Sequence, residues 1–285
     1  MANDFVGTIH RMTVQDVSNE GYLLVKGTEK AVLPRDFAKE ALKANDAVDV
    51  FLFTDKKGRL MATEVLPKVV KGVFDWAEVV EQVPKLGVFV DIGSSVEVLV
   101  SVDDLPAFQS AWPVAGDKLY VTLSTDKQSR LLAVPGSERD FSDLFSYAVE
   151  VELNERVSGR VIRVDREGAV IITDEHYRAF IHHTEQEKEP RLGEYFSGRV
   201  IEVKEDGTLN VSLLPLKHER LSDDAEKIYA YLNEVGGEMP FGDKSDPEKI
   251  RQTFGMSKAA FKRALGRLMK ERKVEQRDGK TFLTK

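Results

Sequence analysis

Phe89 is the first side chain whose place in the sequence points to a particular chemistry. Val88, Val90 and Ile92 alternate around it, which predicts a strand with one buried face. Phe89 and Asp91 then share the opposite face, which is expected to meet solvent. An aromatic ring on that face can stack on an unpaired nucleic-acid base, or it can pack against a neighbouring domain.

A second group of rings lies in the stretch RAFIHH (178–183). In a strand, Phe180 and His182 share one face, and Ile181 lies on the other. The same alternation places His183 opposite His182, so this adjacent pair is not expected to chelate a metal ion. The two rings on the shared face are a second candidate for base contacts.

Cationic side chains concentrate near the end of the sequence. Residues 246–285 contain 12 Lys and Arg against 5 Asp and Glu, a net charge of +7, whereas the remaining residues carry −14. This asymmetry predicts a polyanionic partner for the basic segment. In a helix that starts at Ser257, the residues on one side are Lys262, Arg263, Arg267, Lys270 and Lys273. A solvated helix face is the ordinary alternative, but acidic residues are nearly absent from this side.

Other classes of protein find little support in the composition. The sequence contains no cysteine, which excludes disulfides and thiolate metal sites. It has no Walker loop, no dinucleotide-binding glycine motif and no His and Glu residues at metal-ligand spacing. It also lacks a secretion signal and any apolar run of the ~18 residues that a membrane helix requires. We therefore expect a cytoplasmic protein without cofactor or membrane partner, and not an enzyme.

The elements that must position these residues repeat three times. A strand led by Gly begins each unit, within GTIHRM, KGVFDWAEV and SGRVIRV. Further strands follow in the same order, at 21–25, 30–34 and 45–53, at 87–92, 97–101 and 116–124, and at 168–172, 178–183 and 193–203. Each unit closes with a hairpin, at 55–65, 126–134 and 205–214. Five short strands in ~60 residues predict a small closed barrel.

This pattern resembles the S1 domain, an oligonucleotide-binding (OB-fold) barrel. The resemblance is carried in the second unit by Gly87-Val88-Phe89-Val90, Gly116-Asp117 and Asp126 to Arg130. The first unit has Asn45-Asp46 and Asp55 to Arg59, with Leu23 and Pro34 at the aromatic and His positions. The third unit has Gly168, Ala179-Phe180-Ile181-His182 and Gly193-Glu194.

The S1 resemblance implies roles for two rings, and strand alternation adds a third. Phe89 occupies the position of the stacking aromatic of the family, and His182 matches the His that contacts nucleic acid. Phe180 shares the face of His182. The alternative is that the Phe89 and Phe180 rings fill gaps between domains or cover the end of a barrel.

Two arginines follow an aspartate across a hairpin turn. Arg59 comes four residues after Asp55, and Arg130 four residues after Asp126. The arginines can contact phosphates or stack under bases. Alternatively, the aspartates cap the turns and the arginines form solvated ion pairs with them.

The predicted domains are three S1-like barrels at 1–66, 67–135 and 154–217 and a winged helix-turn-helix domain at 218–285. Residues 136–153 are expected to form a packed connector helix between the second and third barrels, with Phe141, Leu144, Phe145 and Ala148 on one stripe. The fold class is therefore mainly β and multidomain, with an α+β domain at the end.

The winged-helix prediction rests on a change of period from two to 3.6. Ile228, Tyr231, Leu232 and Val235 mark the first helix, Asp246-Pro247 begins a second, and Ser257 caps a third that reaches about Arg272. Residues 274–283 form a hairpin around the Asp278-Gly279 turn. In such a domain the third helix enters a groove, while the hairpin cations Arg277 and Lys280 rest on the backbone.

Three S1-like barrels followed by a winged helix resemble the CvfB family, named for conserved virulence factor B. The resemblance implies single-stranded RNA binding in the cytoplasm and post-transcriptional control of gene expression, including virulence genes. Messenger RNA and the ribosome are the candidate partners, and a monomer is favoured. The alternative is a DNA-binding transcriptional regulator that reads duplex DNA with its winged helix and uses the barrels to dock proteins.

Overall fold

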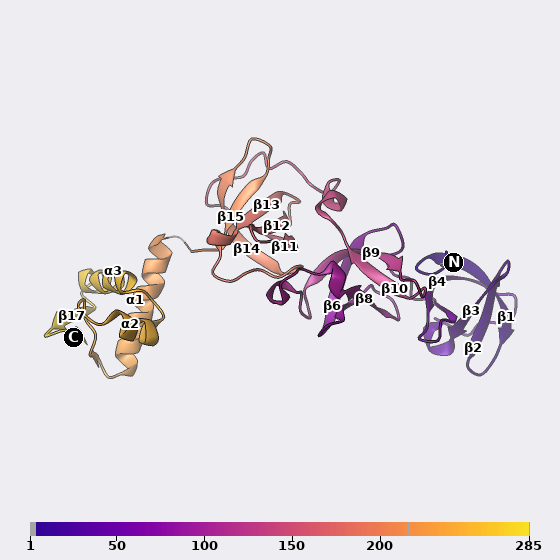
Figure 1. Ribbon diagram of the computed structural model, residues 1–285, viewed down its shortest axis with the longest axis horizontal. Helices are drawn as coiled ribbons and strands as arrows, with labels where there is room; N and C mark the ends of the chain where they lie inside the picture. The colour runs from indigo at the N-terminus through magenta and orange to yellow at the C-terminus, as the bar shows by residue number, and fades with distance from the viewer. Residues whose placement is uncertain (1–3, 216, 285) are drawn as a thin grey trace. The chain divides into compact units, whose positions relative to one another are not determined.

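The computed structural model describes residues 4–215 and 217–284, and it divides into two compact units, residues 1–213 and 214–285. The first unit contains three closed five-stranded barrels, and the second contains α-helices with a small sheet (Figure 1). The predicted fold class, three tandem barrels followed by a winged helix, is confirmed.

The three barrels share one strand order. Barrel 1 consists of β1 (Ile9–Val17), β2 (Gly21–Lys26), β3 (Glu29–Pro34), β4 (Ala47–Thr54) and β5 (Leu60–Thr63). Barrel 2 consists of β6 (Asp75–Val83), β7 (Gly87–Asp91), β8 (Glu97–Ser101), β9 (Lys118–Thr125) and β10 (Leu131–Pro135). Barrel 3 consists of β11 (Arg156–Val164), β12 (Gly168–Thr173), β13 (Arg178–His182), β14 (Tyr195–Val203) and β15 (Leu209–Ser212). The third and fifth strands of each barrel pair in parallel, and the other neighbouring strands pair antiparallel.

The glycine that opens the second strand of each barrel has a steric reason. Gly21, Gly87 and Gly168 have φ values of +153°, +138° and +151°. A Cβ atom on Gly168 would lie 1.9 Å from the carbonyl oxygen of Ile181 on the neighbouring strand. Because only glycine allows both this φ and this approach, the repeated glycine marks the same close crossing in every barrel.

Barrels 1 and 2 share an apolar interface. Along β4, Val50 and Leu52 point into the core of barrel 1, while Phe51 and Phe53 join the core cluster of barrel 2. Phe51 is fully buried there. Both faces of β4 are therefore buried, and the outer face of barrel 1 at this strand is not available to a ligand.

Barrels 2 and 3 are joined by a polar and an apolar contact. The guanidinium of Arg191 donates to both carboxylate oxygens of Asp117, at 3.0 and 3.2 Å. The next residue, Leu192, is buried in the core cluster of barrel 2. The backbone N–H of Lys118 donates to the carbonyl oxygen of Gly193. These contacts fix the loop before β14 against barrel 2.

The connector between barrels 2 and 3 is not the predicted helix. It contains one short 3₁₀ helix, η4 (Glu138–Phe141), and then a turn. Farther along, the N–H groups of Ser146 and Ala148 donate to carbonyl oxygens of His176 and Gly207 in barrel 3. Because these backbone groups bond to the barrel, no α-helix forms in the connector, although the predicted apolar residues do pack. Other 3₁₀ helices are η1 (Arg35–Phe37), η2 (Val102–Asp104), η3 (Gln109–Ala111) and η5 (His183–Glu185).

The second unit is a winged helix. Its elements are α1 (Lys217–Glu234), β16 (Glu238–Met239), α2 (Pro247–Phe254), α3 (Lys258–Lys270), β17 (Val274–Arg277) and β18 (Lys280–Leu283). Asp246 caps α2 and Ser257 caps α3, as their side chains predict. The turn of the wing has positive φ at both Asp278 and Gly279, which suits a two-residue hairpin.

The sequence missed two features of this unit. The strand β16 has two residues, too short for a periodic signal, and it pairs with β18 to form a three-stranded sheet. Val235, expected within the first helix, follows its last residue and is 43% exposed. Within the part of the chain that the structure describes, no helix is long and apolar enough to span a membrane.

Candidate nucleic-acid interface

Phe89 lies on the outer face of barrel 2, as predicted. It is half-buried, and it belongs to none of the buried apolar clusters among the described residues. Phe89 lies on β7, and its cross-strand neighbours are Glu81 on β6 and Leu99 on β8. A ring flanked by a carboxylate suits an uncharged base better than a phosphate, so the geometry is compatible with stacking.

Phe180 lies in different surroundings. It pairs across the ladder with Val170, which is fully buried in a cluster with Phe141 of the connector. Phe180 is half-buried against the same cluster, together with Phe145. The connector thus covers this face of barrel 3, and packing, the alternative drawn from the sequence, describes Phe180 better than base stacking.

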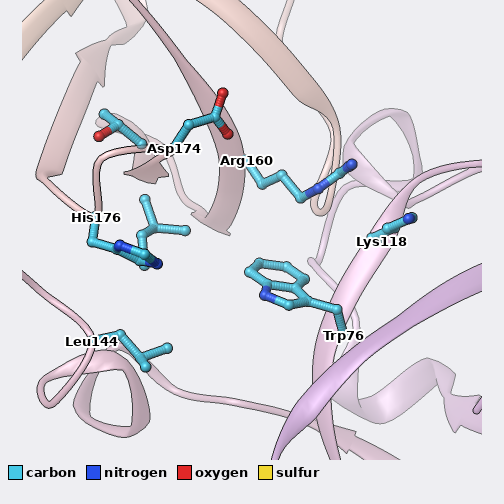
Figure 2. Close-up of a pocket in the computed structure, with 8 residues that line it drawn as sticks. Trp76, Lys118, Leu144, Arg160, Asp174 and His176 are labelled. Carbon is cyan, nitrogen blue, oxygen red and sulfur yellow. The ribbon is translucent and has the colours of Figure 1, made fainter.

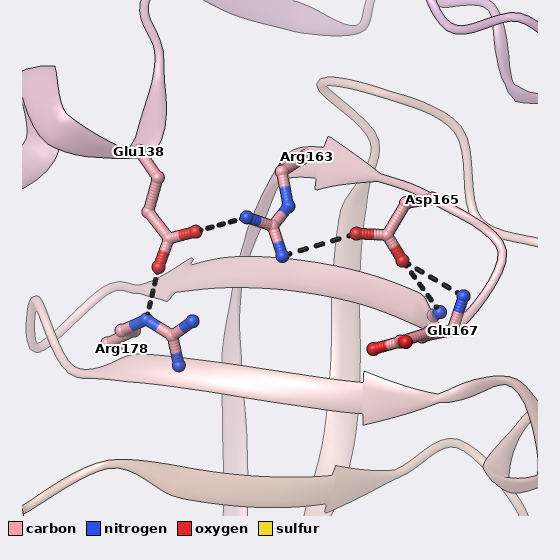
Figure 3. Close-up of polar contacts among 6 residues, drawn as sticks. Glu138, Arg163, Asp165, Glu167 and Arg178 are labelled. Carbon is pink, nitrogen blue, oxygen red and sulfur yellow. Dashed lines mark hydrogen bonds and ion pairs between the residues drawn. The ribbon is translucent and has the colours of Figure 1, made fainter.

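An ion network fastens the connector over barrel 3 (Figure 3). The carboxylate of Glu138 accepts from Arg163 on β11 and from Arg178 on β13, both at 2.6 Å. Arg163 also contacts Asp165 at 3.2 Å. Because one carboxylate bridges two strands of the barrel, the connector is held at the same face that Phe180 occupies.

His182 is exposed at the end of β13. Its Nδ1 lies 2.8 Å from the Thr184 hydroxyl and 3.3 Å from the N–H of the same residue. The prediction that His182 and His183 point to opposite faces is wrong. The strand ends at His182 and η5 begins at His183, so alternation stops and the two rings approach to 4.2 Å. Among the residues that the structure describes, no group of three or more side chains could hold a metal ion.

Arg59 and Arg130 form ion pairs with the aspartates across their hairpin turns, one of the two alternatives drawn from the sequence. Arg59 Nε lies 2.7 Å from the Asp55 carboxylate, and Arg130 repeats this distance to Asp126. Both arginine side chains are more than 60% exposed, whereas both aspartates are 20% exposed. The aspartates shape the turns, and the arginines keep donors that face solvent.

The electrostatics of the two turns agree with this geometry. The backbone N–H of Arg59 and then its side chain lower the pKa of Asp55 below its ordinary value. For Asp126, burial raises the pKa, but hydrogen bonds from Arg130 and Gln128 outweigh burial and lower it. Both carboxylates are therefore held in the charged form by donors of their own turn.

The cationic side of α3 is partly neutralised. Lys262, Arg263 and Lys270 are exposed, and within the described residues they form no ion pair that competes for their charge. Arg267, by contrast, donates to Glu271 at 2.8 Å, and Glu271 also pairs with Lys273. The expectation that acidic residues leave this side free is thus wrong at its C-terminal turn.

The cations of the wing are paired as well. Arg277 lies 2.6 Å from Glu275 on the same strand, and Lys280 lies 2.6 Å from Glu238 on β16. The hydrogen bond with Glu238 raises the pKa of Lys280 above its ordinary value. Glu238 belongs to the strand that the sequence did not reveal, so this pair was not predictable.

Sequence reasoning also missed a cluster at the junction of barrels 2 and 3. Trp76 packs against Tyr120 and Phe141, with ring centroids 5.4 and 6.1 Å apart. Arg160 lies close by, with its guanidinium 5.2 Å from the ring centroid of Tyr195. The alternation of Phe74 and Trp76 in the stretch GVFDWAEV was a signal that could have found the first ring.

Comparisons with known proteins agree with this architecture. Residues 6–64 match the S1 domain, 74–134 the CvfB first S1-like domain, 141–215 the second domain of virulence regulatory factor CvfB, and 226–283 the CvfB-like winged helix domain. The uncharacterized protein YitL of Bacillus subtilis is 43% identical over 95% of this chain and 91% of its own. Conserved virulence factor B of Staphylococcus epidermidis is 37% identical over 99% of this chain and 96% of its own. A solved multidomain protein with nucleic acid binding domains from Streptococcus pneumoniae is 36% identical, covers 99% of both chains and has a TM-score of 0.66.

Proposed function

The chain belongs to the CvfB family, and from this premise we propose that it binds single-stranded RNA through its barrels and its winged helix. S1-like and winged-helix domains point to a nucleic-acid partner. The observation that carries the proposal is the exposed cationic side of α3 in the same chain as barrels of the S1 type. Side chains with no carboxylate partner in the described part of the chain, such as Lys262 and Arg263, contribute affinity through phosphate contacts and counterion release.

Phe89 is the proposed stacking residue of barrel 2. A half-exposed ring outside the apolar clusters can receive an unpaired base with little sequence preference. His182 and the solvent-facing donors of Arg59 and Arg130 are proposed as further contacts, and Arg267, Lys270, Arg277 and Lys280 as part of the basic surface. Duplex DNA offers no such unpaired base, so the ring favours a single strand.

The matched families are S1-like, CvfB and winged-helix domains, which supports a binding protein over an enzyme. Its role is proposed as post-transcriptional regulation in the cytoplasm, on messenger RNA or at the ribosome. The name of the staphylococcal relatives supports virulence genes as targets where the organism is a pathogen.

A binding comparison at fixed salt tests the proposal. The full chain is titrated with single-stranded RNA, with single-stranded DNA of the same sequence and with duplex DNA. The expected order places single-stranded RNA first. A clear preference for duplex DNA would overturn the RNA proposal and support a transcriptional regulator, a function for which the α3 helix and its wing are the relevant observation.

A further inference from the structure

A cavity of about 300 Å³ lies between barrels 2 and 3 within the first unit (Figure 2). Its lining comes from β6 and β9 of barrel 2, from β11 and the end of β12 in barrel 3, and from the connector. Small-molecule sites usually enclose ~300–1,000 Å³, so this cavity is sized for a small planar group.

Trp76 provides one wall of the cavity. Its indole packs against Tyr120 and Phe141, at the apolar cluster that Phe180 also contacts, but it is half-exposed and lines the cavity. Figure 2 shows Trp76 on one side of the cavity and His176 and Leu144 on the other. A supported indole beside an open space is a stacking platform for an aromatic base.

Two cations lie on the Trp76 side of the cavity. The guanidinium of Arg160 is held against the Tyr195 ring and donates to the Gly193 carbonyl oxygen at 3.3 Å. Lys118 lines the cavity from β9, and its only ion pair among the described residues is a long, exposed one with Glu78 at 3.8 Å. A fixed guanidinium and an ammonium group in the lining of one cavity suit a phosphate.

The loop after β12 of barrel 3 offers groups that can read a base. The Tyr195 hydroxyl donates to the Asp174 carboxylate at 2.5 Å, which fixes this side chain. Carboxylates accept hydrogen bonds from the amino groups of bases. His176 has a φ of +66°, a conformation uncommon for residues with a side chain, and it places the imidazole in the lining.

The cavity is preformed, because its two walls are bonded to each other. Arg191 and Asp117 join the barrels next to it, and their side chains are only 20% and 9% exposed. A Cβ atom on Gly193 would lie 2.6 Å from the Lys118 carbonyl oxygen, so the barrels approach closely there. A site held in this way loses little conformational entropy on binding.

We propose that this cavity binds one unpaired nucleotide of an RNA strand, with the base on Trp76 and the phosphate facing Arg160 and Lys118. The proposal rests on the proposed RNA-binding function, because it takes the nucleotide from a bound strand. A free nucleoside monophosphate has the same chemistry, and the experiment separates the two sources.

Tryptophan fluorescence reports on the site directly, because Trp76 lines the cavity and the sequence has one other tryptophan, Trp112. Trp112 is buried, and its indole N–H donates to the Pro106 carbonyl oxygen, so a Trp112→Phe variant leaves Trp76 as the reporter. This variant is titrated with a single-stranded oligoribonucleotide of about 12 nucleotides, within the site size of an oligonucleotide-binding barrel. In a second arm the four nucleoside 5′-monophosphates are used. Saturable quenching by the oligoribonucleotide is expected at concentrations at which the monophosphates quench little.

Two variants of the otherwise unchanged chain test the contacts. Trp76→Ala is expected to weaken oligoribonucleotide binding about 5- to 100-fold, the loss that removal of one stacked base produces. Arg160→Gln replaces the charged guanidinium with a neutral amide that can still donate a hydrogen bond. It is expected to weaken binding less than Trp76→Ala does and to lower the salt dependence of binding. Phe108→Ala removes a ring that is 43% exposed elsewhere on barrel 2 and serves as the matched control.

The outcomes separate this proposal from the RNA proposal. If the unchanged chain binds the oligoribonucleotide but Trp76 is not quenched and both variants bind normally, the cavity is not a nucleotide site and RNA binding stands. If the chain binds no oligoribonucleotide but the monophosphates quench Trp76 with saturation, the cavity takes a free nucleotide and the RNA proposal fails. If neither ligand quenches or binds, both proposals fail.

Discussion

Phe89 and Phe180 occupy the same rung of equivalent ladders, yet they meet different surroundings. Phe89 faces Leu99 across the second and third strands of barrel 2, and Phe180 faces Val170 across those of barrel 3. The connector covers Phe180 in barrel 3, whereas Phe89 in barrel 2 stays half-exposed. A side chain of the same type is therefore a binding candidate in one barrel and a packing residue in the next.

Alanine variants of the two rings should lose different properties. Phe89→Ala is expected to weaken RNA binding by about 1–3 kcal/mol with an unchanged melting temperature, since the ring is proposed to stack on a base and belongs to no apolar cluster among the described residues. Phe180→Ala is expected to lower the free energy of unfolding by about 1–3 kcal/mol, less than the roughly 3–5 kcal/mol of a fully buried ring, with affinity nearly unchanged. Thermal unfolding and RNA titration of both variants check this. A Phe89 variant that melts early but binds normally would assign that ring to packing instead.

The aspartates of the hairpin turns should make stability depend on pH in a definite direction. Hydrogen bonds within their turns lower the folded-state pKa of Asp55 and Asp126. A lowered folded-state pKa contributes stability above the unfolded-state value of about 4, and this stability is lost as pH falls through the folded value. In Asp126→Asn, melting temperatures between about pH 7 and pH 3 should therefore fall less steeply than in the unchanged chain. An equally steep fall in both proteins would show that this carboxylate does not contribute.

At the scale of elements, α3 divides its cations into two sets. Lys262, Arg263 and Lys270 project without an ion pair among the described residues, while Glu271 neutralises the end of the helix. Glu271 itself has a lowered pKa, caused first by Arg267 and then by Lys273. The first set can exchange bound counterions for phosphates. Arg267 and Lys273 must first break their ion pairs with Glu271.

Neutralising the first set should change the salt dependence of binding. The triple variant Lys262→Gln, Arg263→Gln, Lys270→Gln is expected to reduce the slope of log affinity against log salt by about 2, at ~0.7 for each phosphate contact with a single strand. The matched control, Lys227→Gln, Lys249→Gln, Arg251→Gln, removes the same charge from α1 and α2. Equal slopes in the two triple variants would show that net charge, and not the α3 surface, governs binding.

At the scale of the first unit, the three barrels share core residues and are not structurally independent. Phe51 and Phe53 of barrel 1 complete the core of barrel 2, and Leu192, which precedes the fourth strand of barrel 3, does the same from the other side. The Asp117 side chain is 9% exposed and bonded to Arg191. The hydrogen bond with Asp117 raises the pKa of Arg191 above its ordinary value, as expected for a paired cation.

Breaking this pair should uncouple barrels 2 and 3. Arg191→Ala leaves the Asp117 carboxylate without its main partner and is expected to cost about 2–4 kcal/mol, slightly below the roughly 3–5 kcal/mol of a fully buried pair. Denaturant unfolding should then show a separate transition for barrel 3. The control, Arg11→Ala, breaks an exposed pair with Asp49 and should cost less than about 1 kcal/mol. Equal losses in both variants would mean that this ion pair does not hold the barrels together.

Local patterns of the sequence were sufficient for much of this protein. The Asp-to-Arg turns, the caps of α2 and α3 and the wing turn are set by interactions over a few residues, so each was predictable. The glycine of each second strand was visible as a repeat, although the close approach that requires it is made by the neighbouring strand. Three repeats of one pattern then determined the barrels and the family.

Only the tertiary structure decided which of the faces that the sequence predicts to meet solvent are in fact uncovered. Whether Phe180 meets solvent depends on Phe141, whose segment bonds to barrel 3 instead of forming its own helix. Whether Lys280 is a free cation depends on Glu238, 42 residues away in the sequence. The cavity beside Trp76 needs two barrels to exist at all. Alternation along a strand tells which side a residue faces, but what covers that side is set by distant parts of the chain.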